Sequence, residues 1–338
     1  MRRSRILAIS TLLLLSPFTA EVLTGATPLP SFINPLNLII LMGLYGLGAL
    51  LIRESRVILH IGYQGILLIG FAYGIIEEGL AVKSFFNPYW KDIGIFGSYG
   101  RWMGVNWIWT IYLTIFHGVW SILAPILVVE ALYPDIMNER WLGRKGLLLA
   151  LLFFSIDVMI LNIALTSYQP SIIHYLSCLV TITILVYLSR KIVKNKRIES
   201  TIKNPKQYGV YWALWAILFF TGFYIISSLS PPPIIPFIIG VLALITSLEL
   251  TKEIEQTHNL LHRYWLYTGI TSILLLIDIL LALHNVERIL ASILTIIFLL
   301  VLHRRIKVNQ YKLKTDLYIR GSLRERILSK HVIMSLTK

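Results

Sequence analysis

Ten apolar stretches, each close to the length of a membrane-spanning helix, constrain this chain more than any other feature. A helix needs about 20 apolar residues to cross the hydrocarbon core of a bilayer. The stretches lie at residues 5–22, 33–52, 57–82, 107–131, 146–167, 171–189, 209–229, 233–249, 264–284 and 287–303. We therefore expect an all-α, polytopic integral membrane helical bundle. The eighth and tenth stretches are short, and the sequence does not decide whether they cross completely.

The composition excludes the soluble classes of protein. Of the 338 residues, 56% are hydrophobic and 14% are charged, whereas a soluble chain carries about 25% charged residues. A soluble protein of this size has too little interior to bury so much apolar surface. The single cysteine, Cys178, excludes a disulfide scaffold.

The distribution of basic residues predicts the orientation. Cytoplasmic loops carry an excess of Lys and Arg. If the N-terminus is cytoplasmic and every stretch crosses, all but four of the 31 basic residues fall on the cytoplasmic side; the four are Lys83, Lys91, Arg101 and Arg288. We therefore expect both termini to be cytoplasmic and the protein to lie in the cell membrane. Arg2, Arg3 and the small residues near Ala20 also resemble a signal peptide, but Phe18 is unfavourable for cleavage, so we expect a retained span.

Residues 304–338 form a basic cytoplasmic tail after a transmembrane domain of residues 1–303. The tail mixes Lys and Arg with Leu and Ile, which favours binding to anionic lipid headgroups and a helix on the membrane surface. The net charge of +14 is spread along loops at the membrane border. We therefore expect no nucleic-acid partner.

Polar residues are concentrated in residues 1–168, and residues 169–303 are mostly apolar. The third stretch ends with the adjacent carboxylates of Glu77 and Glu78. Gly70 and Gly74 form a small-residue face on which another helix can approach closely, and we expect the glycines of the second stretch to supply that contact. Tyr73 lies four residues before Glu77, on a neighbouring face.

The fourth stretch carries a polar stripe. The residues of the stripe are spaced for one face of a helix, and they are Asn106, Thr110, Thr114, His117 and Ser121. Lipid penalises such a stripe, so it is expected to face a cavity or the protein interior. The aromatic, glycine-rich segment 84–105 precedes it and contains Arg101; it either anchors the protein at the membrane border or folds over a site as a lid.

Helical rise places His117 and Asp157 at a similar depth. Each lies about 16 Å along its own stretch, so an ion pair between them is possible. Glu77 is expected about 10 Å above His117 on the same basis.

These residues predict a candidate site. Glu77, Glu78, His117 and Asp157 are candidate catalytic residues. Tyr73, Asn106, Thr110, Thr114, Ser121 and Arg101 are candidates for substrate binding. His117 is also a candidate metal ligand, and a divalent cation such as zinc needs three protein ligands.

The pair Glu77-Glu78, the nearby Lys83 and the later Phe116-His117 resemble CAAX-protease-type intramembrane peptidases. The resemblance covers residues 77–121. The sequence departs from that family at Val82, where the family has Arg, and at Leu113, where it has Phe. A later histidine followed four residues on by Asn or Asp is also missing, so no family is assigned.

Three functions remain open from the sequence. The first is a membrane-embedded hydrolase or transferase with an extracytoplasmic-facing Glu/His site, because the polar residues cluster in one part of the chain. The second is a proton- or ion-coupled secondary transporter, since ionisable residues inside spans mark ion pathways. Many transporters consist of two similar halves, and no such internal repeat is visible in this sequence. The third is a membrane scaffold or receptor.

Overall fold

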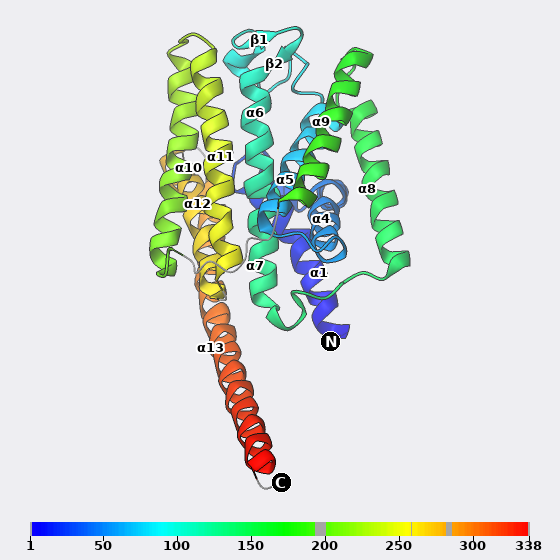
Figure 1. Cartoon of the computed structure of the whole chain (residues 1–338). Coiled ribbons are helices and arrows are strands. Elements are labelled where there is room, and N and C mark those ends of the chain that lie inside the picture. Colours follow the sequence, from blue (N-terminus) through cyan, green and yellow to red (C-terminus); the bar gives the residue numbers. More distant parts are fainter. Residues whose placement is uncertain (1, 193–200, 258, 282–285, 337–338) are drawn as a thin grey trace.

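The computed structural model is a bundle of long helices, and the last helix projects from one end of it (Figure 1). It describes residues 2–192, 201–257, 259–281 and 286–336. The long helices after residue 140 are α8 (Arg144–Ala164), α9 (Ile172–Lys191), α10 (Pro205–Ser228), α11 (Ile234–Gln256), α12 (Leu260–Leu281) and α13 (Val286–Leu336).

The first part of the chain builds its spans from shorter segments. Those spans combine α1 (Arg2–Pro17) with η1 (Phe18–Val22), α3 (Pro35–Leu41) with η2 (Met42–Gly46) and α4 (Leu47–Ile58), α5 (Tyr63–Ile75) with η3 (Ile76–Ala81), and α6 (Trp107–Phe116) with η5 (His117–Leu123) and α7 (Ala124–Leu132). In each of these spans a π-helical segment interrupts or ends the α-helix. A short helix, α2 (Leu29–Phe32), and two 3₁₀ turns, η4 (Gly94–Gly97) and η6 (Pro134–Ile136), lie in the connections.

Ten helical segments of the described chain are long and apolar enough to cross a membrane. They agree with the ten predicted stretches, so the prediction of an all-α multi-pass membrane protein is confirmed. The eighth and tenth segments are longer than expected, at Ile234–Gln256 and Arg288–Leu313. The last span continues without interruption into the tail as α13, because the Lys- and Arg-rich tail keeps residues that favour a helix.

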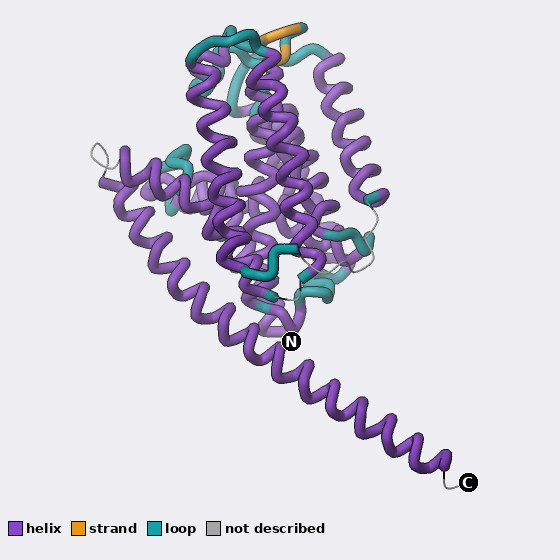
Figure 2. The backbone as a smooth tube through the Cα atoms, turned by 60° about the vertical axis from the view of Figure 1, so that its left-hand side comes forward, coloured by secondary structure: helices purple, strands orange, loops and turns teal. Residues whose placement is uncertain are grey.

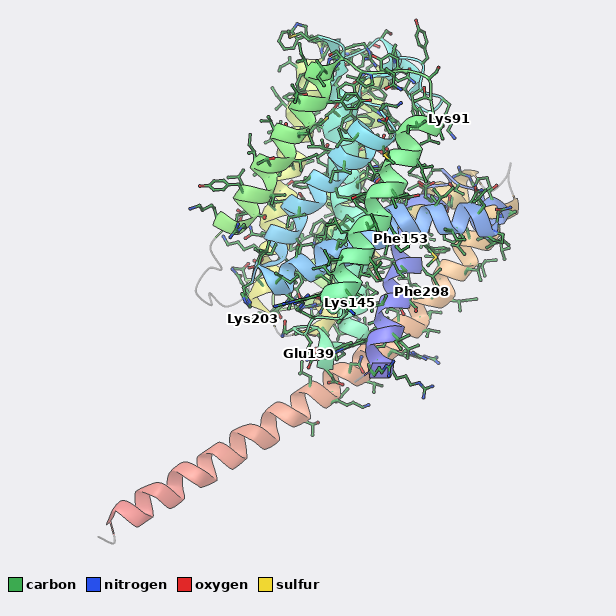
Figure 3. All side chains as sticks on the ribbon, turned by 90° about the vertical axis from the view of Figure 1, so that its right-hand side faces the viewer. Lys91, Glu139, Lys145, Phe153, Lys203 and Phe298 are labelled. Carbon is green, nitrogen blue, oxygen red and sulfur yellow. The ribbon has the colours of Figure 1, made fainter. Side chains whose placement is uncertain are left out.

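The charged side chains labelled in Figure 3 lie towards the two ends of the bundle. In Figure 3, Glu139, Lys145 and Lys203 lie towards the end from which α13 projects, and Lys91 lies towards the other end, with Phe153 and Phe298 between. Both termini lie on the α13 side of the bundle in Figure 1. That this side is cytoplasmic stays a prediction from the distribution of basic residues.

The fourth span is the centre of the bundle. Within its apolar window 94% of the residues are buried, compared with 17% for α8 and 11% for α9. Aromatic rings of α10 stack against it: Tyr112 lies on Phe223, and Trp120 on Trp215. The described residues between 169 and 303 therefore share one hydrophobic core with the first part of the chain.

Close glycine packing joins α5 to the fourth span. A Cβ atom on Gly70 would lie 3.0 Å from the Cα of Gly118, and one on Gly74 would lie 3.0 Å from the Cα of Thr114. The expectation that the second span makes this contact is wrong. Gly46 instead faces α1, and Gly48 faces the ring of Tyr73.

A compact loop covers the bundle end opposite α13. It contains a two-stranded antiparallel hairpin of β1 (Arg101–Trp102) and β2 (Val105–Asn106), which Figure 2 shows as the two short strands. The Arg101 guanidinium donates to the carbonyl oxygens of Phe86, Gly97 and Gly104. The Asn106 side chain accepts from the Trp109 backbone N–H and so caps α6. These contacts fix the loop on the helix that follows it.

The glycine contact gives a stability prediction. Gly74→Leu is expected to lower the free energy of unfolding by about 1–3 kcal/mol, because a side chain there must push the two backbones apart. The midpoint of thermal unfolding in detergent measures the effect. Gly146→Leu is the control, since a Cβ atom at Gly146 meets only Leu142 of the adjoining turn. Equal midpoints for the two variants would contradict the packing described here.

Candidate functional site

Two buried glutamates converge on one buried histidine. Glu77 and Glu78 lie in η3, and His117 is the first residue of η5. The Nδ1 atom of His117 lies 3.0 Å from Oε2 of Glu77, and its Nε2 atom lies 3.1 Å from Oε1 of Glu78. The three residues are 1%, 8% and 3% exposed. We call Glu77, Glu78 and His117 the Glu-Glu-His cluster.

The π-helical geometry of both segments explains how these residues meet. A π-helical turn holds one residue more than an α-helical turn, and such turns are frequent at functional sites. In η3 two adjacent glutamates contact the same imidazole ring. The expectation that Glu77 lies about 10 Å above His117 counted the helical rise of the third stretch from residue 57. It is wrong because α4 continues to Ile58 and α5 begins only at Tyr63, so Glu77 lies lower along its span.

Glu78 is held by a hydrogen-bonded chain of defined direction. The Trp109 indole Nε1–H donates to Ser84 Oγ over 3.0 Å. Because an indole is only a donor, the Ser84 hydroxyl accepts there and donates its own proton to Oε2 of Glu78. Glu78 therefore has one oxygen on Ser84 and the other facing His117.

The turn after η3 places Ser84. Lys83 has a positive φ of 65°, which reverses the chain so that Ser84 returns to Glu78. Its buried ammonium donates to the carbonyl oxygens of Asn162 and Thr166, near the end of α8, over 2.6 and 3.2 Å. Burial lowers the pKa of Lys83. A cation is stabilised at a helix C-terminus, so Lys83 anchors this turn rather than pairing with the glutamates.

Glu77 lies among further polar and aromatic groups. Its Oε2 atom and the Tyr73 hydroxyl are buried, and neither has a hydrogen-bond partner of good geometry among the described residues. The rings of Tyr45 and Tyr73 lie 6.1 and 6.3 Å from the His117 ring. The Tyr45 hydroxyl donates to Glu21 over 2.5 Å.

The cluster lies in a cavity of about 870 Å³. The wall includes the loop residues Tyr89, Trp90, Lys91 and Asp92, which lie at the end of the bundle opposite α13. Other wall residues come from η1 and the turn after it, from α3, α6, α8 and α10. Segment 84–105, for which an anchor and a lid both remained open, thus contributes residues to this wall.

Carboxylates outnumber cations around the cavity. Glu21, Glu77, Glu78 and Asp92 line it, and Lys91 is the one Lys or Arg among its described lining residues. No ion pair between Lys or Arg and Glu77 or Glu78 occurs in the described chain. The site therefore favours a cation or a cationic group.

Asp157 does not join the cluster. The expected His117–Asp157 pair is not formed, because the described partners of His117 are Glu77, Glu78 and Ser121. Asp157 faces the second span instead, where a Cβ atom on Gly43 would lie 2.9 Å from its Oδ2 atom.

The polar stripe of the fourth span has mostly structural contacts. Only His117 of the stripe lines the cavity. Ser121 Oγ lies 3.1 Å from Nδ1 of His117, Thr110 Oγ1 donates to the Asn106 carbonyl, and Thr114 packs on Gly74. Tyr73 and Arg101, the other two candidates for substrate binding, also lie outside the cavity lining.

Sequence reasoning missed Glu21, Tyr45, Ser84 and Trp109. Glu21 was visible as an acid at the end of an apolar stretch, which is a signal for function. Ser84 and Trp109 carry no such signal, because their role depends on the turn at Lys83.

A charged network closes the α13 end of the bundle. Glu130 accepts from Tyr63 and Arg263, and it lies 3.4 Å from guanidinium nitrogens of Arg53 and Arg56. Glu54 pairs with Arg53 over 2.7 Å. These side chains pair with one another and bind together α4, α7 and α12, so the network has a structural role.

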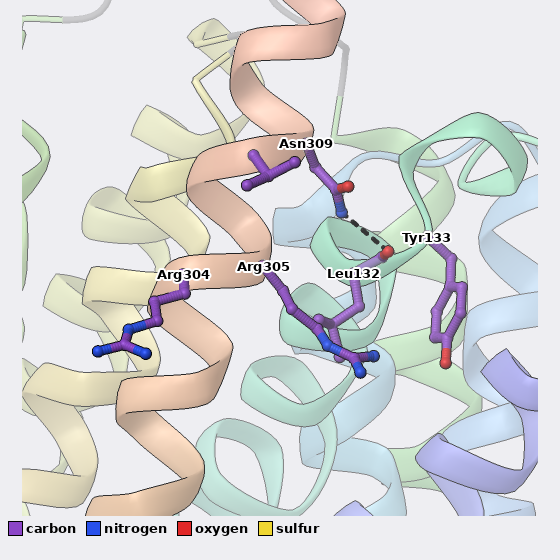
Figure 4. A pocket seen from close by; sticks show the side chains of 6 residues that line it. Leu132, Tyr133, Arg304, Arg305 and Asn309 are labelled. Carbon is purple, nitrogen blue, oxygen red and sulfur yellow. Dashed lines mark hydrogen bonds between the residues drawn. The ribbon is translucent and has the colours of Figure 1, made fainter.

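A second cavity, of about 310 Å³, lies between α7 and α13 (Figure 4). Its lining includes Arg304, Arg305 and Tyr133, and Asn309 donates to the carbonyl of Leu132 over 2.9 Å. Its described lining contains no acidic residue. The binding of anionic lipid headgroups near the basic tail stays a prediction, and these two arginines are the residues that favour it most.

The chain from Trp109 to Glu78 gives a prediction. Ser84→Ala is expected to destabilise the protein by about 1–3 kcal/mol, because a buried carboxylate oxygen loses its donor. Thermal unfolding in detergent measures this against Ser177→Ala, whose hydroxyl is exposed and bonds only within α9. If both variants melt like the unmodified protein, Ser84 does not hold Glu78.

Comparison with known proteins places the chain in a family. A family model described as an uncharacterized membrane protein family matches residues 11–311. No curated protein and no solved structure matches the chain. The matched range contains every residue of the Glu-Glu-His cluster and ends within α13. Because the match covers most of the sequence, the chain belongs to this uncharacterized membrane protein family and is a multi-pass member of it.

Proposed function

We propose that the chain is a membrane-embedded hydrolase whose site is the Glu-Glu-His cluster. The observation that carries the proposal is the position of two carboxylates on the two nitrogens of a single buried imidazole, inside a cavity. Carboxylate and imidazole groups in contact are the usual means of moving protons in hydrolysis. The cavity volume lies in the range of about 300–1,000 Å³ that is typical of small-molecule sites.

The arrangement suits the activation of water. A water molecule beside Glu77 gives one proton to the carboxylate while its oxygen attacks the electrophilic carbon or phosphorus of the substrate. The bond to the leaving group then breaks, and the leaving group takes a proton from the cluster. His117, 3.0 Å from Glu77, carries protons between the two carboxylates. Glu78, held by Ser84, orients the imidazole.

A transferase follows the same chemistry with an acceptor hydroxyl in place of water. Water as the nucleophile is the simpler proposal, because it needs no second binding site for an acceptor. The substrate enters from the membrane side opposite α13, since the loop residues Tyr89 to Asp92 line the cavity there. With the predicted orientation this side is extracytoplasmic and the membrane is the cell membrane.

A carrier is less well supported than a hydrolase. A carrier must open its site alternately to both sides. The charged network around Glu130 fills the α13 end of the bundle with buried, mutually paired side chains. Opening a path there requires separating those pairs, which is strongly unfavourable.

Labelling from solvent tests the proposal without knowledge of the substrate. The purified protein is incubated with a total membrane extract in H₂¹⁸O, and mass spectrometry identifies products that have gained one solvent oxygen. We expect such products with the unmodified protein. Glu77→Gln is expected to lower their rate of formation by about 10²–10⁴-fold, because an amide cannot take the proton of water.

Glu139→Gln is the matched control. Glu139 pairs with Arg5 and is partly exposed, so its loss is expected to leave the labelled products unchanged. If no labelled product distinguishes the unmodified protein from Glu77→Gln, the hydrolase proposal is wrong.

A further inference from the structure

We infer that Glu77, Glu78 and His117 together bind one divalent cation of the zinc or manganese type. This inference rests on the proposed site and names the cofactor that it uses. One ligand atom from each of the three residues can be chosen so that all lie within 4.8 Å of one another. Three protein ligands with one position left open are typical of catalytic metal sites.

Ser121 and Ser84 contact one nitrogen of His117 and one oxygen of Glu78, which leaves the other nitrogen and oxygen for a metal. Nδ1 of His117 lies 3.1 Å from Ser121 Oγ and 3.0 Å from Glu77 Oε2. In the tautomer whose Nδ1–H donates to Ser121, Nε2 keeps a lone pair for a metal. Ser84 donates to Oε2 of Glu78, so Oε1, which faces Nε2 of His117, is the oxygen that remains for a metal. Metal-binding histidines are oriented in this way by a partner on the other ring nitrogen.

The two remaining atoms, Nε2 of His117 and Oε1 of Glu78, lie at a distance that suits two ligands of one metal ion. Nε2 of His117 and Oε1 of Glu78 lie 3.1 Å apart. Neighbouring ligands bound at about 2.0–2.1 Å to one cation are separated by about 3 Å. Two lone pairs at this distance repel, so the contact holds either a shared proton or a cation bound by both atoms. Glu77 supplies the third ligand from the same π-helical segment.

The surrounding charge also favours a cation. Two carboxylates are buried in the cluster, and Glu21 lies nearby on Tyr45. Lys83, the nearest basic residue in sequence, is bound to the end of α8. Burying several carboxylates without a compensating positive charge is very costly. A divalent cation would supply that charge, and with Glu77 among its ligands it would replace Glu77 as the group that activates the water.

Metal binding can be measured without any substrate. The full-length protein is purified, exposed to Zn²⁺, Mn²⁺ or Co²⁺ and dialysed. Elemental analysis is expected to find about one equivalent per chain, and the Co²⁺ form is expected to absorb visible light as a protein-bound ion. His117→Gln and Glu78→Gln are expected to abolish binding. Ser121→Ala, which removes an outer partner, is expected to weaken it by about 10–100-fold.

Asp157→Asn is the matched control, because Asp157 is a buried acid outside the cluster. It is expected to retain the metal. Absence of metal from the unmodified protein would overturn the inference, as would loss of metal in Asp157→Asn. Thermal unfolding of each variant shows whether it is folded. If a metal-free protein still forms labelled hydrolysis products, the hydrolase proposal holds and the metal inference is wrong. If metal binds but no labelled product forms, the metal inference holds and the hydrolase proposal is wrong.

Discussion

The close approach of α5 to the fourth span is the contact on which the candidate site depends. Gly70 and Gly74 on one side, and Gly118 on the other, remove the side chains that would hold the two backbones apart. Small residues permit this kind of contact in membranes, where no hydrophobic force brings helices together. One turn beyond Gly74, the same contact brings η3 against η5. The glutamates of one span therefore meet the histidine of the other.

The surrounding structure supplies polar partners to the Glu-Glu-His cluster and separates the cluster from the end of the bundle from which α13 projects. The turn at Lys83 brings Ser84 back to Glu78, and the anchored loop places its aromatic residues in the cavity wall. At the other end, the network around Glu130 binds three helices together. A buried acid–imidazole cluster is costly for a membrane protein unless its charges are balanced. That cost makes a functional role, with a bound proton or cation, the most economical explanation of its presence.

Much of the fold could be predicted from the sequence, because apolar runs and basic loops reflect the bilayer directly. Glu77, Glu78 and His117 were also identified as candidates, since ionisable residues inside spans are rare. Their mutual contact was not predicted. Helical rise alone misjudged their depth, because the rise was counted from residue 57, whereas α5 begins at Tyr63. The same reasoning paired His117 with Asp157, although Asp157 packs on Gly43. Tertiary contacts such as that from Trp109 through Ser84 to Glu78 depend on a single backbone turn, which spacing does not reveal.

Cross-linking between the two spans tests the convergence on His117 most directly. Glu78→Cys and His117→Cys are combined in a protein whose one native cysteine is removed by Cys178→Ser. The structure predicts that Hg²⁺ bridges the two thiols, so that one ion is retained per chain and both thiols become unreactive towards a maleimide. Each single-cysteine variant shows the reactivity of an unbridged thiol. If both thiols of the double variant still react independently after Hg²⁺ treatment, the two side chains are not in contact and the account of the site is wrong.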